Sequence, residues 1–155
     1  MNVEDLMERE VLTARPDTPV SALARQMYET RRSSVPVIDD ARRVVGIVTM
    51  TDLVVRNANL HFPRYIKLLD SVIYLESTKE YEEELRKVLA STAGELMTTP
   101  VRTVRVGTDA GDAAAELFEH KITALPVVDE HNRLVGLLSQ FEFVKLIAQD
   151  AAAAG

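Results

Sequence analysis

A short stretch of the chain combines two hydroxyl groups and a carboxylate at the end of an apolar run: Gly46-Ile47-Val48-Thr49-Met50-Thr51-Asp52. The run predicts a buried strand that leads directly into a helix. The N-terminus of a helix offers free backbone N–H groups and a partial positive charge, which suit a phosphate. A carboxylate beside it can accept hydrogen bonds from a ribose diol. The stretch therefore has groups for both polar parts of a nucleotide, but Thr49 and Asp52 also match a plain capping box.

The chain contains this arrangement twice. Residues 5–58 align without a gap on residues 95–148 at a constant offset of 90, and sixteen of the 54 paired positions are identical. This similarity predicts two copies of one supersecondary unit. We therefore divide the chain into a first repeat (1–58), a connector (59–94), a second repeat (95–148) and a C-terminal tail (149–155). Residues 151–155 of this tail are expected to be frayed.

Each repeat predicts a helical turn followed by β-α-β-β-α, which is an α+β fold. The two central strands of each repeat are apolar at nearly every position, so both faces of each small sheet are expected to be buried. Neither repeat can achieve this alone, and we expect one folding unit. The predicted elements are helical turns at 4–7 and 95–97, first strands at 11–13 and 101–104, helices at 20–30 and 110–120 with Thr18 and Thr108 as N-caps, strands at 35–38, 44–48, 125–128 and 134–138, and closing helices from Thr51 and Phe141.

The connector is expected to be ordered. His61-Phe62-Pro63 should end the preceding helix, and a capping-box pattern at Ser77 opens a helix to about Ala90. The apolar residues of this helix pack either on their own repeat or on another subunit. They are Tyr81, Leu85, Val88 and Leu89, and a shorter helix is predicted from Tyr65, Leu68, Leu69 and Val72.

Composition excludes several classes of protein. The chain has 155 residues, no Cys and a net charge of −6, which disfavours disulfides, cysteine chemistry and an extended surface for nucleic acid. No stretch approaches the roughly 18 apolar residues of a membrane span, and the acidic N-terminus lacks a signal-peptide pattern. No metal-ligand spacing, nucleophile elbow or phosphate-binding loop is present. We expect a cytoplasmic protein that is not an enzyme and requires no metal or cofactor.

The repeated motifs resemble a known family. Val35-Pro36-Val37-Ile38-Asp39, followed by G-I-V-T-x-x-D up to Asp52, resembles the CBS domain, named after cystathionine β-synthase. Two such domains in tandem resemble a Bateman module, and small stand-alone CBS-pair proteins often carry a similar connecting helix. The resemblance covers both repeats. It implies that the repeats pack through their sheets in pseudo-two-fold symmetry, with no further catalytic or transporter domain.

The resemblance also implies an adenosine ligand, such as AMP, ADP, ATP or S-adenosylmethionine, in two related clefts between the repeats. The family's Asp holds the ribose, and the neighbouring hydroxyl groups approach the phosphate. Carried onto this chain, the main cleft would use Ser34, Val35, Pro36, Thr49, Thr51, Asp52 and Thr108.

The second cleft departs from the family pattern and is expected to be weaker. Glu142 replaces the Asp, and Phe141, in place of the second hydroxyl, blocks a phosphate, stacks on an adenine or packs in the core. The residues of this cleft would be Thr18, Ala124, Leu125, Pro126, Ser139 and Glu142, and the cations available for a phosphate in either cleft are Arg15, Arg31, Arg32, Arg105 and Lys121.

These expectations describe a regulatory module for energy sensing that binds and reports. They imply a homodimer and an unidentified protein partner that receives the signal, without nucleic acid or membrane. The alternative is a constitutive interaction module with degenerate clefts that bind no ligand.

Overall fold

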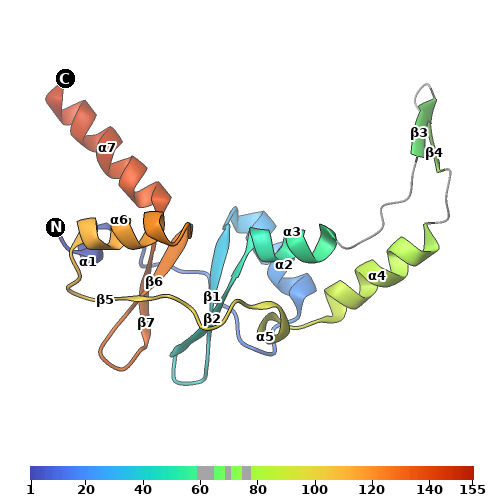
Figure 1. Cartoon of the computed structure of the whole chain (residues 1–155), viewed down its shortest axis with the longest axis horizontal. Coiled ribbons are helices and arrows are strands. Elements are labelled where there is room, and N and C mark those ends of the chain that lie inside the picture. The colour runs from blue at the N-terminus through green and yellow to red at the C-terminus, as the bar shows by residue number, and fades with distance from the viewer. Residues whose placement is uncertain (59–64, 69–70, 75–77) are drawn as a thin grey trace.

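The computed structural model describes residues 1–58, 65–68, 71–74 and 78–155. Two similar halves lie side by side, each with a hairpin of two strands and helices around it (Figure 1). This architecture confirms the predicted α+β class. The first half comprises α1 (Val3–Leu6), α2 (Val20–Thr30), β1 (Ser34–Ile38), β2 (Val44–Thr49) and α3 (Met50–Ala58), and the second α5 (Ala93–Leu96), β5 (Val104–Arg105), α6 (Ala110–Glu119), β6 (Ala124–Val128), β7 (Leu134–Ser139) and α7 (Gln140–Ala154).

The two hairpins have the same register. Ser34 lies opposite Thr49 in β1 and β2, and Ala124 lies opposite Ser139 in β6 and β7. Each hairpin also carries an irregularity at the same place, before the last pair of its ladder. The shared register places the start of the first strand beside the helix N-terminus that follows the second strand, in both repeats.

The leading helical turns are exchanged between the repeats. α1 packs on α6, α7 and β7 of the second repeat, and α5 packs on α2 and β2 of the first (Figure 1). Val3 is fully buried in the core of the second repeat, and its N–H donates to the carbonyl of Thr108 at 2.9 Å. Ala93 is buried in the core of the first repeat, and its N–H donates to Thr18 at 2.8 Å. Each core therefore contains a segment of the other repeat.

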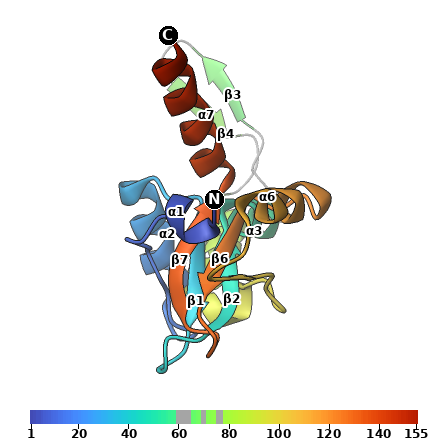
Figure 2. The same cartoon turned by 90° about the vertical axis from the view of Figure 1, so that its left-hand side faces the viewer.

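A third apolar cluster joins the two hairpins directly. Ile38 and Val44 of the first repeat pack on Val128 and Leu134 of the second. Backbone hydrogen bonds link the same regions, because Val44 N–H donates to the carbonyl of Asn132 at 3.1 Å. The repeats thus pack through their sheets with pseudo-two-fold symmetry, as the resemblance implies. Seen from the side, α7 extends away from this centre (Figure 2).

The predicted first strands are wrong in their positions. Residues 11–13 form no strand, and only Ala14, the next residue, pairs with Val37 of β1. In the second repeat, β5 begins three residues after the start of the predicted strand at 101–104. The reason is the exchange of the leading turns: Glu8 pairs with Leu137 of the other repeat, so the following residues cross between repeats. The N-caps also lie one residue later than predicted, at Pro19 and Asp109.

The connector contains a hairpin where a short helix was predicted. Its elements are β3 (Tyr65–Leu68), β4 (Ser71–Tyr74) and α4 (Lys79–Ala90). Tyr65 pairs with Tyr74 and Ile66 with Ile73, and such aromatic and β-branched residues favour strands. Leu69 and the predicted helix break at residues 61–63 lie outside the described residues.

The helix predicted from Ser77 is confirmed as α4, although Ser77 itself and the side chains of Leu85 and Val88 lie outside the described part. α4 contacts α2 and α3, which favours packing on its own repeat over a purely subunit contact. The tail is helical, because α7 continues to Ala154 through a run of alanines, the strongest helix formers. Its fraying stays a prediction.

Candidate functional site

The N-terminus of α3 has the capping geometry that the motif predicted. Oδ2 of Asp52 accepts from the backbone N–H of Thr49 at 2.8 Å and from its hydroxyl at 3.1 Å. The N–H of Asp52 donates to Thr49 Oγ1 at 3.3 Å. The other carboxylate oxygen, Oδ1, accepts from the hydroxyl of Thr98 at 3.2 Å. Asp52 therefore caps its helix and also links the first repeat to Thr98 at the start of the second.

The N-terminus of α7 repeats this arrangement with a longer carboxylate. Oε2 of Glu142 accepts from the backbone N–H of Ser139 at 2.7 Å and from its hydroxyl at 2.5 Å. Within the described part of the chain, no hydrogen bond to Oε1 of Glu142 is found, in contrast to Oδ1 of Asp52. Phe141 is exposed, so the alternative that it packs in the core is wrong.

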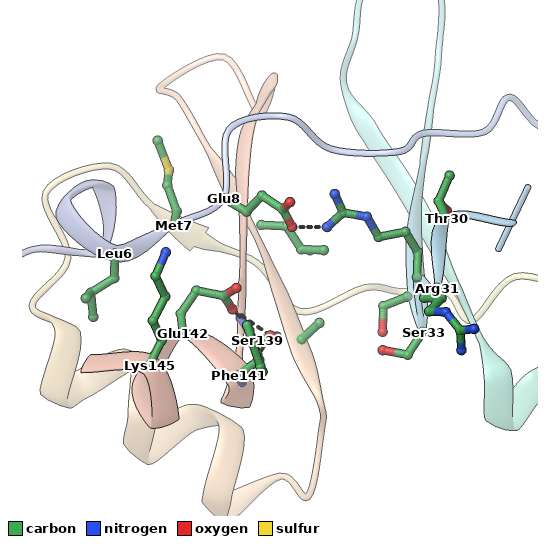
Figure 3. Close-up of a pocket in the computed structure, with 14 residues that line it drawn as sticks. Leu6, Met7, Glu8, Thr30, Arg31, Ser33, Ser139, Phe141, Glu142 and Lys145 are labelled. Carbon is green, nitrogen blue, oxygen red and sulfur yellow. Dashed lines mark hydrogen bonds and ion pairs between the residues drawn. The ribbon is translucent and has the colours of Figure 1, made fainter. Parts of the chain in front are cut away.

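A cavity of about 430 Å³ lies between the repeats beside Glu142 (Figure 3). Its volume falls within the range of roughly 300–1,000 Å³ that is usual for small-molecule sites. Glu142 and Lys145 extend from α7 into it on the side of Met7 and Glu8 (Figure 3). The wall consists of residues 6–8 and 30–34 with Ala124, Leu137, Ser139, Phe141, Glu142 and Lys145.

Ser34 supplies an unpaired hydroxyl at this wall. The residue is 5% exposed, and its Oγ has no hydrogen-bond partner among the described residues. A buried polar atom without a partner costs about 1–3 kcal/mol, so such groups commonly mark a site where another molecule completes the bonding. The Ser34 hydroxyl is therefore a candidate contact for a polar ligand in the cavity.

The cavity also contains charges of both signs. A guanidinium nitrogen of Arg32, Nη1, donates to Oε2 of Glu8 in an ion pair, marked by the dashed line at Glu8 in Figure 3. This hydrogen bond is the main reason that the pKa of Arg32 is raised above its ordinary value, and the charges of Glu8, Glu142 and Glu10 add to the effect against desolvation. Arg31 and Lys145 complete the positive side of the wall.

The cavity groups residues differently from the sequence analysis. Ser34 was assigned to the cleft of Asp52, but it lines the cavity of Ser139 and Glu142. Each wall of the cavity thus comes from a different repeat: one from the start of β1 and the other from the N-terminus of α7. Ala124 also lines this cavity, as predicted for its cleft.

The remaining predicted residues are less directly placed. Val35, Pro36, Leu125 and Pro126 are fully buried, so only their backbone is a candidate for contact. Thr51 is exposed at the start of α3. The ranking of the two clefts stays a prediction.

The two early threonines lie outside the cavity. Thr108 lines a separate shallow hollow with Arg105 and Asp112. The hydroxyl of Thr18 accepts from the N–H of Arg15 at 2.9 Å, and Thr18 is not part of the cavity wall. Their assignment as ligand contacts across the pair stays a prediction.

The five cations that the sequence offers for a phosphate lie in different places in the structure. Arg31 and Arg32 line the cavity, whereas Arg15 pairs with Asp40. Arg105 and Lys121 line other hollows.

Seven residues of the wall were missed, among them Glu8, Ser33 and Lys145. Glu8 lies before the predicted first strand, and nothing in the local sequence indicates that it reaches the other repeat. Lys145 lies one helical turn after Glu142, a spacing of three that does place both on one side of a helix; this signal was present in the sequence.

The described residues do not indicate a metal site or a membrane-spanning helix. Among the residues that the structure describes, no three or more His, Asp or Glu side chains are grouped as a metal site would require. In the same ranges, no helix combines the length and the apolar character needed to cross a membrane.

Comparisons with known proteins agree with this architecture. The sequence profile of the CBS domain matches residues 3–58 and 93–149. CBSX2, a chloroplastic CBS domain-containing protein of Arabidopsis thaliana, is 32% identical over 140 residues, which cover 87% of this chain. The chain spans 58% of the length of that relative.

Solved structures show the same fold. CBSX2 in complex with AMP has a TM-score of 0.74 to this chain at 28% sequence identity, covering 97% of this chain and 98% of that one. The CBS domain pair of protein MJ0100, in complex with 5′-methylthioadenosine and S-adenosyl-L-methionine, has a TM-score of 0.73 at 19% identity, with the same coverage. Since the profile matches both halves and CBS pairs share the arrangement of the whole chain, the protein belongs to the CBS domain family and contains two CBS domains in tandem.

Proposed function

We propose that this protein is a non-enzymatic regulatory module that binds an adenosine-containing ligand in the cavity between its two CBS repeats. The observation that carries the proposal is the cavity itself, because it joins an unpaired buried hydroxyl, a helix N-terminus and a guanidinium in about 430 Å³. The AMP complex of CBSX2, a relative with the same fold, supports an adenosine nucleotide as the class of ligand.

The groups of the cavity suit the parts of such a ligand. Oε1 of Glu142 can accept a hydrogen bond from a ribose hydroxyl while Oε2 keeps its capping bonds. Arg32 and the Ser34 hydroxyl can bind a phosphate, since guanidinium–phosphate hydrogen bonds are among the strongest in proteins. The exposed ring of Phe141 offers a surface for an adenine. Asp52 in the opposite cleft, which the resemblance favours for ribose, is proposed as a second site.

Binding would link the two repeats, because the wall of the cavity comes from both of them. A ligand shifts the relative orientation of the repeats only by the difference in its affinity for the two arrangements. A regulatory role therefore implies a partner protein that recognises one arrangement.

The test is calorimetric titration with AMP, ADP, ATP, S-adenosylmethionine and NAD. We expect Glu142→Gln to lower the affinity for the nucleotide about tenfold or more, since a hydrogen bond to a charged group is worth about 1.5–3 kcal/mol. The amide oxygen of Gln can still accept the capping bonds of Ser139, so the helix should remain intact. Asp52→Asn is the matched control in the opposite cleft and is expected to leave this site unchanged.

Different outcomes contradict different parts of the proposal. If only Asp52→Asn weakens binding, the ligand occupies the opposite cleft. If no adenosine ligand binds the unmodified protein below the millimolar range, the sensor proposal is wrong and the interaction module is favoured.

We also propose that the protein forms a homodimer through an apolar helical face, which consists of Tyr28, Val54, Phe118 and Val144. Tyr28 is 84% exposed, and Phe118, its counterpart at the offset of 90, is 83% exposed. Val54 and Val144, also exposed, are related in the same way. α2, α3, α6 and the start of α7, which carry these residues, lie on the side opposite the hairpin turns (Figure 1). A face that is itself repeated about a pseudo-two-fold axis suits the isologous contact of a symmetric dimer.

A further inference from the structure

The ion pair between Arg32 and Glu8 connects the two repeats across the cavity. Glu8 is held on the second repeat, because its N–H and carbonyl exchange hydrogen bonds of 2.9 Å with Leu137 of β7. Arg32 is held on the first repeat, because its N–H donates to the carbonyl of Met27 at 3.0 Å in the C-terminal turn of α2. Both backbone positions are therefore fixed, and the two side chains meet over the cavity.

The opposite cleft does not contain this pair. At the offset of 90, Thr98 takes the place of Glu8 and Ile122 the place of Arg32. Thr98 occupies the same backbone position as Glu8, since it exchanges hydrogen bonds with Ile47 of β2. Its hydroxyl donates to Asp52 instead. The backbone frame is thus common to both clefts, and the pair of charges is a feature of one cleft alone.

Glu8 presents to Arg32 the same chemistry as a phosphate. A carboxylate and a phosphate both offer two oxygens that match the fork of a guanidinium. The side chains of Arg32 and Glu8 are 33% and 30% exposed, so the pair is partly shielded from water and yet remains accessible to a competing anion.

We infer that Glu8 acts as an internal competitor for the phosphate-binding Arg32, so that a phosphorylated adenosine ligand enters the cavity by displacing Glu8. This inference rests on the proposed function. Glu8 then lowers the affinity for nucleotides, whereas the affinity for adenosine, which has no phosphate, does not depend on Glu8. Displacement of Glu8 also breaks the ion pair that connects the repeats. Ligand binding therefore replaces a direct contact between the repeats by a contact that the ligand makes with both of them.

The experiment measures the affinity of AMP, ATP and adenosine for the full chain and its Glu8→Gln, Arg32→Gln and double variants by calorimetry. We expect Glu8→Gln to strengthen AMP and ATP binding about fivefold, because a partly exposed ion pair is worth up to about 1 kcal/mol. Adenosine affinity should stay unchanged. Arg32→Gln should lower the affinity for both nucleotides. The double variant should have the same affinities as Arg32→Gln, since Glu8 acts only through Arg32.

Glu10→Gln is the matched control, because it removes the same charge from an exposed residue that acts on Arg32 only at longer range. It should leave all three affinities unchanged. If the unmodified protein binds nucleotide and Glu8→Gln does not strengthen it, or strengthens adenosine equally, the inference is wrong while the proposed function stands. If no variant, including Glu8→Gln, binds any of the three, the inference is wrong. The proposed function is then also wrong if ADP, S-adenosylmethionine and NAD fail to bind the unmodified protein. Thermal unfolding of each variant verifies that it is folded.

Discussion

Ser34 illustrates how one side chain can indicate a site. Its place just before the V-P-V strand is visible in the sequence, but many serines occupy such positions. The informative property is that its hydroxyl is buried, has no partner among the described residues and lies at the wall of a cavity. A protein that needed only stability would gain by an alanine there.

Replacing Ser34 by Ala should therefore separate stability from binding. We expect Ser34→Ala to raise the free energy of unfolding of the ligand-free protein by about 1 kcal/mol, since the unpaired hydroxyl no longer has to be desolvated. The same substitution should lower the affinity for the nucleotide. Urea unfolding and calorimetry measure the two effects. Ser33→Ala, at an exposed position of the same wall, should change stability little. A clear loss of stability in Ser34→Ala would show that the hydroxyl has a structural role.

The hairpin turns of the two repeats have equivalent hydrogen bonds. Oδ1 of Asp39 accepts from the N–H groups of Ala41 and Arg43 at 2.9 Å. Asp129 makes the equivalent bonds in the second hairpin, also at 2.9 Å. The bond from the Arg43 backbone is the main reason that the pKa of Asp39 lies below its ordinary value, and the bond from the Arg133 backbone has the same effect on Asp129. These carboxylates organise turns, which accounts for their repetition without a metal.

The lowered pKa values predict how these turns respond to acid. A carboxylate with a lower pKa in the folded state stabilises the fold above the unfolded pKa of about 3.9, and this contribution is lost as the pH falls through the lower, folded value. We expect the Asp39→Asn/Asp129→Asn variant to be less stable than the unmodified protein at pH 7. The difference should shrink below about pH 4.

Urea unfolding between pH 7 and pH 3 measures this difference. Glu130→Gln changes an exposed carboxylate in the second turn and serves as the control, with no expected effect. A stability difference that is constant over this pH range would contradict the assigned role of the two aspartates.

Local patterns predicted some elements well and others poorly. The helices α2 and α6 followed from apolar periodicity and the four central strands from continuous apolar runs, because their partners lie within the same repeat. The first strands did not, because Glu8 and Thr98 pair with the opposite repeat, and no local signal encodes a partner so distant in the chain. The connector hairpin was missed because Tyr65, Leu68, Leu69 and Val72 have the i, i+3, i+4, i+7 spacing of a helix. The pairing of β3 with β4 depends on a neighbouring segment that this spacing does not indicate.

Because α1 and α5 are exchanged, the core of each repeat depends on a segment of the other repeat. Val3 completes the second core and Ala93 completes the first. We therefore expect the repeats to unfold together, in agreement with the prediction of one folding unit. The apolar helical face lies outside both cores, so the fold itself gives no reason for its exposure; a second copy of the chain would cover it.

The dimer has a direct test. We expect the protein to have twice the chain mass of 17.2 kDa in light scattering coupled to size-exclusion chromatography. Val54→Asp and Val144→Asp should each yield monomers, because a buried, unpaired carboxylate costs several kcal/mol at an interface. Val106→Asp, at an exposed position outside the apolar helical face, should remain dimeric. A monomeric unmodified protein, or a dimer that tolerates both charges, would refute the proposed contact.

The amino-acid sequence alone was sufficient to predict the repeat, the fold class, the central strands and helices, and the capping motif at Asp52. All of these depend on neighbours within a few residues or on similarity at a fixed offset. The composition of the cavity was not accessible in this way. Ser34, Arg32, Glu8 and Glu142 meet because the first repeat supplies the start of a strand and an exchanged segment, and the second repeat supplies a helix N-terminus. That meeting depends on how two cores pack against each other, a long-range property that no local pattern carries.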